Sequence, residues 1–91
     1  MNNQNELIKI LLSTLYQAKE QNTDLKEVKI LIDNLIIKYG IDMVERIKDL
    51  NEKGYTHITY ANGTGKYFFT RANENYITLK GIEYLNNNFN I

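Results

Sequence analysis

The stretch 43–85 constrains the fold most, because it joins a helical pattern, a hairpin signal and a second helical pattern. Its first part repeats apolar residues every three or four positions, which places them on one helical face: Met43, Ile47 and Leu50. Gly54 predicts the end of this helix, since glycine adopts the left-handed C′ conformation without strain. A helix that runs directly into a β-hairpin predicts an α+β fold.

The hairpin is predicted from composition and turn chemistry. Residues 55–60 and 66–70 are mostly β-branched or aromatic, as strands are. Asn62-Gly63 lies between them and is a strong signal for a tight hairpin turn. Side chains alternate along a strand, so either Tyr67 and Phe69 or Phe68 and Thr70 should face the core.

A third short β run is predicted over residues 76–78, directly before the last helix. Thr78 is expected to cap that helix, which should span about 79–87. The tail 86–91 is polar, although Phe89 and Ile91 could dock against the body.

The first of two further helices is predicted over Glu6–Gln21, with Asn5 as its N-cap. Its apolar residues follow the i, i+3, i+4 rule: Leu7, Ile10, Leu11, Thr14, Leu15 and Ala18.

The second helix should begin after Thr23 or Asp24, with Glu27 supporting a capping box, and end at Gly40. Its expected inner face is Leu25, Val28, Ile32, Leu35, Ile36 and Tyr39, widened by Leu31. Asp42 is the expected N-cap of the third helix.

Length and composition indicate one small domain over residues 1–91, with frayed ends at about 1–4 and 88–91. The net charge is zero, so a strongly basic nucleic-acid-binding class is not indicated. There are no cysteines, no bilayer-length apolar run and no leader-like N-terminus, so we expect a cytoplasmic protein that does not bind membranes. Abundant Asn, Ile and Lys suggest an AT-rich genome, such as a low-GC bacterium or its plasmids and phages.

The order of these motifs resembles the winged-helix (winged helix-turn-helix) superfamily, in particular small plasmid- or phage-encoded members. The resemblance rests on a helix ending Leu50-Asn51-Glu52-Lys53-Gly54-Tyr55, the hairpin, and Ile77-Thr78-Leu79-Lys80-Gly81-Ile82-Glu83-Tyr84-Leu85. It implies three N-terminal helices, a small antiparallel sheet forming the wing and a short C-terminal helix. The third helix would be the recognition helix.

Gly63-Thr64-Gly65-Lys66 superficially matches part of a phosphate-binding loop. A P-loop needs an earlier glycine where Tyr60 stands and a Ser or Thr where Tyr67 stands, and it lies between a strand and a helix. The four residues are therefore interpreted as the tip of the wing.

No enzymatic site is predicted. His57 is the single histidine and is expected on the open face of the sheet, and Ser13 lies within the first helix. The carboxylate pairs Asp42 with Glu45 and Asp49 with Glu52 are typical of a solvated helix face. We expect no metal, no cofactor and no small-molecule substrate.

The nucleic-acid hypothesis rests on the resemblance and on local charge. Residues 54–81 carry three basic side chains and one acidic one, whereas residues 1–53 carry eight basic and nine acidic ones. The predicted DNA-contacting residues lie in the hairpin and on or just after the third helix: Lys66, Arg71, Asn62, Thr64, Lys53, Arg46 and Lys48.

The third helix departs from the usual DNA-reading pattern. Asp42 and Glu45 oppose phosphates, and Val44 offers no hydrogen bond to a base. The wing is therefore expected to carry most of the contact.

The sequence predicts a sequence-specific binder of double-stranded DNA. A small neutral chain offers few phosphate contacts, so a homodimer is expected, joined through the first helix or Phe89. The role would be transcription regulation or an accessory function at a transfer origin or partition site, in conjugation or partition. The alternative is a winged-helix protein-interaction module of a phage or mobile element that binds a host protein.

Overall fold

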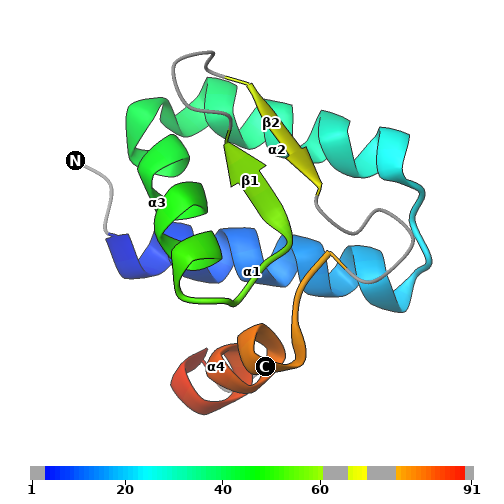
Figure 1. Ribbon diagram of the computed structural model, residues 1–91, viewed down its shortest axis with the longest axis vertical. Coiled ribbons are helices and arrows are strands. Elements are labelled where there is room, and N and C mark those ends of the chain that lie inside the picture. Colours follow the sequence, from blue (N-terminus) through cyan, green and yellow to red (C-terminus); the bar gives the residue numbers. More distant parts are fainter. Residues whose placement is uncertain (1–3, 61–65, 70–75, 90–91) are drawn as a thin grey trace.

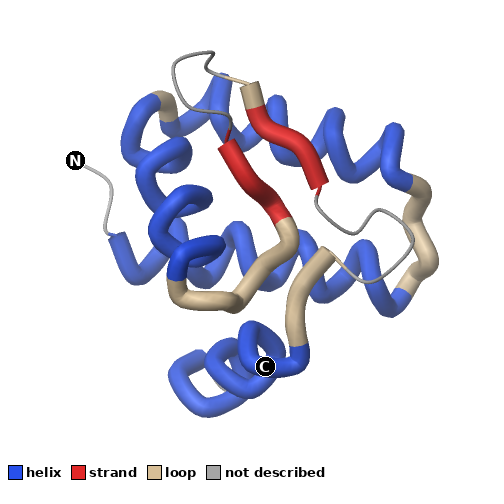
Figure 2. Tube along the Cα trace, in the orientation of Figure 1, coloured by secondary structure: helices blue, strands red, loops and turns tan. Residues whose placement is uncertain are grey.

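The computed structural model describes residues 4–60, 66–69 and 76–89. These form an α+β fold in which three helices precede a two-stranded sheet and a fourth helix follows it (Figure 1). The elements are α1 (Gln4–Glu20), α2 (Leu25–Tyr39), α3 (Ile41–Glu52), β1 (Ile58–Tyr60), β2 (Tyr67–Phe69) and α4 (Leu79–Phe89). Figure 2 shows how small the sheet is beside the helices that surround it.

α1 lies at the centre of the molecule and packs against α2, α3 and α4. In Figure 1, α2 and α4 lie on opposite sides of it. Its buried residues are Leu7, Ile8, Leu11, Leu12, Leu15 and Ala18. Ile8 and Leu12 lie outside the predicted stripe, and their burial shows that the covered face of α1 is broader than predicted. Ile10 and Thr14, which the stripe included, are only half-buried.

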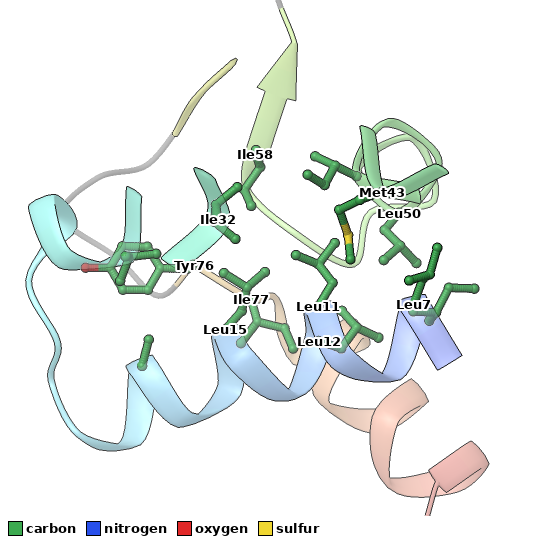
Figure 3. Packing of buried hydrophobic residues seen from close by; sticks show 14 of the residues in the cluster. Leu7, Leu11, Leu12, Leu15, Ile32, Met43, Leu50, Ile58, Tyr76 and Ile77 are labelled. Carbon is green, nitrogen blue, oxygen red and sulfur yellow. The ribbon is translucent and has the colours of Figure 1, made fainter. Parts of the chain in front are cut away.

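The rest of the core comes from every other element (Figure 3). Met43, Ile47 and Leu50 of α3 are fully buried, which confirms the predicted face of that helix. Phe69 is buried and Phe68 is 47% exposed, so the Tyr67 and Phe69 side of β2 faces inward. Burying these apolar side chains supplies most of the driving force for folding.

Helix ends explain how the chain turns between α1, α2 and α3. The Asp24 side chain accepts a hydrogen bond of 3.1 Å from the backbone N–H of Glu27. Asp24 is therefore the N-cap of α2, and Thr23, the other predicted candidate, is not. Gly40, with φ +67°, both ends α2 and caps α3, so the prediction of Asp42 as N-cap was wrong. Asn5 is likewise not a cap, because α1 already includes Gln4.

The end of α3 is a Schellman turn centred on Gly54, which has φ +80°. The N–H of Gly54 donates to the carbonyl of Asn51 (3.0 Å), and that of Tyr55 donates to the carbonyl of Leu50 (2.9 Å). This pair of bonds reverses the chain direction and sends it into β1.

The sheet is antiparallel, with Ile58 opposite Phe69, Thr59 opposite Phe68 and Tyr60 opposite Tyr67. Both strands are shorter than predicted. The third β run is reduced to a single bridge between Thr56 and Ile77, supported by the His57 N–H to the Tyr76 carbonyl.

α4 begins as predicted, because the hydroxyl of Thr78 accepts a hydrogen bond of 3.0 Å from the N–H of Gly81. It continues to Phe89, beyond the predicted end, and Phe89 lies edge-on to Tyr84 at 6.2 Å. Gln4, Asn88 and Phe89 therefore lie within helices rather than in frayed ends.

α2 contributes less to the core than its composition suggests. Only Val28 and Ile32 are buried, and the other predicted inner residues are half-buried. Leu31 is 41% exposed, so it does not widen the inner face as predicted. Ile30 and Ile37 are also exposed.

Candidate nucleic-acid interface

The hairpin reaches α2 through the side chain of Tyr67. Its hydroxyl lies 3.0 Å from the backbone carbonyl of Lys29 and 2.5 Å from a carboxylate oxygen of Asp33. Alternation along β2 explains this position, because Tyr67 and Phe69 point to the same side of the strand. A tyrosine is long enough to span the gap while the strand itself stands away from α2.

An open hollow of about 320 Å³ lies between the hairpin and α2. It is lined by Lys29, Asp33, Lys66 and Tyr67. Among the described residues, two lysines and one tyrosine thus line the hollow together with one aspartate, whose carboxylate lies beside the Tyr67 hydroxyl. Lysine ammonium groups on an open surface suit the phosphate oxygens of a nucleic-acid backbone.

Lys66 is the predicted contact residue that this hollow includes. Lys29 was not predicted as one, because it lies on α2, far from the hairpin in the sequence. The helical periodicity predicts that Lys29 is exposed. The proximity of Lys29 to Lys66, however, follows from the packing of the hairpin against α2. Asn62, Thr64 and Arg71 lie outside the described residues.

The three predicted residues of the α3 region are differently placed. The side chain of Arg46 is only 16% exposed and lies 3.9 Å from the carboxylate of Glu45. Lys53 forms an ion pair of 3.1 Å with Asp49, one turn earlier in the chain. Lys48 is exposed. α3 therefore presents fewer available cations than its sequence suggests.

α3 is attached to the first strand through the side-chain amide of Asn51. The amide is oriented so that its nitrogen faces hydrogen-bond acceptors and its oxygen faces a donor. In this orientation the nitrogen donates to the carbonyls of Thr56 (3.1 Å) and Ile58 (2.9 Å). The other amide atom lies 3.4 Å from the hydroxyl of Thr59. Thus α3 borders β1, whereas the Lys29–Lys66 hollow borders β2, and the predicted contact residues are divided between the two edges of the sheet.

The residues considered for catalysis are scattered. His57 is half-buried just before β1, and Ser13 is half-buried within α1. Among the described residues, no group of three or more His, Cys, Asp or Glu side chains is arranged to hold a metal ion. Asp42 and Glu45 are exposed on the surface of α3.

Tyr16 and Tyr76 have raised pKa values, and neither is among the described residues that line the hollow. The Glu20 carboxylate, one turn further along α1, raises the pKa of Tyr16 by accepting a hydrogen bond and by its charge. Burial raises the pKa of Tyr76, with a further contribution from the negative charge of Asp24. The Tyr76 hydroxyl donates to the carbonyl of Thr23 at 2.7 Å, so this group is structural.

No protein-family model, curated protein sequence or solved structure matches this chain. In the part of the chain that the structure describes, no helix combines the length and apolar character needed to cross a bilayer.

Proposed function

We propose that this protein binds double-stranded DNA, with the hairpin as the main contact. The observation that supports this most is the placement of Lys29 and Lys66 around one open hollow. Each ammonium group can neutralise a backbone phosphate and release a counterion. Two such contacts on one surface would form part of a phosphate-binding surface.

The arrangement of elements supports a winged-helix assignment within this proposal. Three helices precede an antiparallel hairpin and a last helix follows it, in the order that the resemblance implied. In such a fold the hairpin is the wing and α3 the recognition helix. We assign α3 a supporting role, through the exposed Lys48, because the side chain of Arg46 is largely buried.

Sequence specificity would come from residues of the hairpin tip that reach base edges. Asn62, Thr64 and Arg71 are the proposed candidates, since an arginine fork suits a guanine edge and an asparagine amide suits adenine. The cellular role we propose is transcription regulation, or an accessory role at a plasmid or phage transfer origin or partition site in the cytoplasm.

A protein-interaction module is the second candidate, and a specific observation favours it. The exposed acidic residues of α3 are Asp42, Glu45 and Glu52, which would repel a DNA backbone. A basic protein partner would fit such a helix better than DNA does.

Fluorescence anisotropy on the DNA that flanks the gene, at two salt concentrations, tests the proposal. Lys66→Ala and Lys29→Ala should each weaken DNA binding. The loss should be smaller than the about 1–3 kcal/mol expected for a lost base contact. Each substitution should also reduce the slope of log K against log salt concentration by about one. The backbone carbonyl of Lys29 still accepts from Tyr67 in its variant, so the hairpin stays in place. Lys48→Ala should have a smaller effect.

Lys9→Ala is the matched control, because Lys9 is exposed on α1, away from the hairpin. It should bind like the wild type. If the Lys66 and Lys29 variants bind as tightly as the Lys9 variant, the hollow is not the DNA contact. If the wild-type protein binds no DNA at low salt, the protein-interaction module becomes the better interpretation.

A further inference from the structure

The outer face of α2 exposes large apolar side chains that the fold does not cover. Ile37 is 81% exposed and Ile30 is 55% exposed, and they lie two helical turns apart on the side opposite the buried Val28 and Ile32. Ile41, the first residue of the next helix, α3, is also exposed, at 67%. Apolar surface gathered on one helix is typical of an interaction site.

The charges beside these isoleucines form two distinct flanks. Glu27 and Lys38 lie on one flank, near opposite ends of α2 and eleven residues apart, which is close to three full turns. Lys29 and Asp33 lie on the other flank, beneath the hairpin, where Tyr67 contacts both residues. Lys26 is exposed on the face itself, one turn before Ile30. On the flank of Glu27 and Lys38, a partner must match a Glu at one end and a Lys at the other.

We propose that the face is covered by the same face of a second copy of this chain, with the two α2 helices antiparallel. Antiparallel pairing centred between Asp33 and Asn34 places Ile30 opposite the partner's Ile37, and Ile37 opposite the partner's Ile30. It also brings Glu27 of each copy near the partner's Lys38, so two opposite-charge pairs form by symmetry. The net charge of zero adds no overall repulsion between copies.

A two-fold axis that relates antiparallel helices runs perpendicular to the plane that contains both. It therefore passes between the two helices, and it keeps each flank of α2 on the same side of the dimer in both copies. Because the hairpin lies over the Lys29–Asp33 flank, both hairpins come to lie on the same side of the dimer. Asp33, close to the axis, lies beside the Tyr67 hydroxyl and shares the hollow with Lys29 and Lys66, which offset its charge.

This assignment replaces the two interfaces expected from the sequence. The apolar residues of α1 are mostly buried inside the molecule, and Phe89 is half-buried and packs against Tyr84. The dimer does not depend on DNA binding, and its test uses no DNA.

Sedimentation equilibrium of the full chain, from micromolar to about 100 micromolar, decides whether the face pairs. The wild type should sediment at about twice the 10.7 kDa chain mass. Ile37→Asp should shift the protein to a monomer, since it places a charge in the apolar contact. Leu79→Asp is the matched control, because Leu79 is a 72% exposed leucine at the start of α4, and it should leave the dimer intact.

A wild-type monomer throughout this range would overturn the proposal, and so would an Ile37→Asp variant that dimerises like the wild type. Circular dichroism should show unchanged helix content in both variants, because both side chains are already exposed.

Charge reversal tests the antiparallel arrangement itself. Glu27→Lys alone and Lys38→Glu alone should each raise the dimer dissociation constant, by about five- to tenfold, because two attractive pairs become repulsive. An equimolar mixture of the two variants should restore the wild-type dissociation constant, since all pairs are opposite again. In a parallel dimer Glu27 would face Glu27, so the single variants would dimerise as well as the wild type, and that result would overturn the arrangement.

Discussion

α1 and α2 are neighbouring amphipathic helices, yet they are used in opposite ways. α1 buries residues over a broad face, because α2, α3 and α4 all pack against it. α2 is the richer in isoleucine and leucine, yet it fully buries only Val28 and Ile32. Burial is therefore decided by how many elements pack around a helix, and the number of apolar residues that it carries does not decide it.

The difference leaves each helix with a distinct task. α1 has its apolar surface covered within the chain and acts as the core of the fold. α2 stabilises the fold through its inner face, and its outer face retains exposed isoleucines beside the charged pair Glu27 and Lys38. An apolar surface that folding leaves exposed is available for association.

The largest expected effect compares one residue from each helix. Leu11→Ala should lower the free energy of unfolding by about 2–5 kcal/mol, because Leu11 is fully buried and its loss leaves a cavity. Ile37→Ala should change it by at most about 0.5 kcal/mol, as expected for a surface position. Urea denaturation at submicromolar concentration measures both without a contribution from dimerisation. Equal losses at the two positions would show that the two helices do not differ in this way.

A second prediction concerns the cover that α4 provides for α1. A Cβ added at Gly81 would lie 2.2 Å from the carbonyl oxygen of Tyr55 and 2.8 Å from the side chain of Ile77. Gly81→Ala should therefore push α4 away and cost about 1–3 kcal/mol, as overpacking does. Thermal denaturation would show this, together with loss of protection in hydrogen exchange at Leu12. Gly54→Ala is a useful comparison, because nothing lies within 4 Å of a Cβ added at Gly54. The cost of that substitution arises from the backbone conformation alone, at φ +80°.

A smaller effect is expected at the connection between α1 and α2. Tyr76→Phe removes the hydroxyl that donates to the Thr23 carbonyl and should cost about 0.5–1.5 kcal/mol. Denaturant titration measures this loss, and Tyr16→Phe is a control at a tyrosine outside that connection.

The pH dependence of stability provides a further test of Tyr76. Burial raises its pKa above the ordinary 10.0, so the folded state holds the phenolic proton more tightly than the unfolded state does. Its contribution is therefore complete below pH 10 and is lost as the pH rises through the folded-state pKa. The wild type should lose more stability above pH 10 than Tyr76→Phe does. Parallel curves for the two proteins would contradict this explanation.

The sequence alone determined the identity and order of the elements. Glycine at C′, side-chain caps and apolar periodicity are local signals, because they depend on residues within one or two turns of each other. They correctly placed the buried face of α3 and the Thr78 cap, whereas the inward side of β2 was left open between two alternatives. They failed for Asn5 and Asp42, because α1 and α3 already include Gln4 and Ile41, so both predicted caps lie inside their helices.

Only the tertiary structure decided which surfaces are covered and which side chains meet. The covered face of α1 is broad because α4, more than fifty residues later, packs onto it together with α2 and α3. Leu31 and Ile37 are exposed because no described element packs outside α2. Lys29 lies near Lys66 because Tyr67 spans from the hairpin to α2. These contacts depend on the packing of distant segments, which local periodicity does not specify.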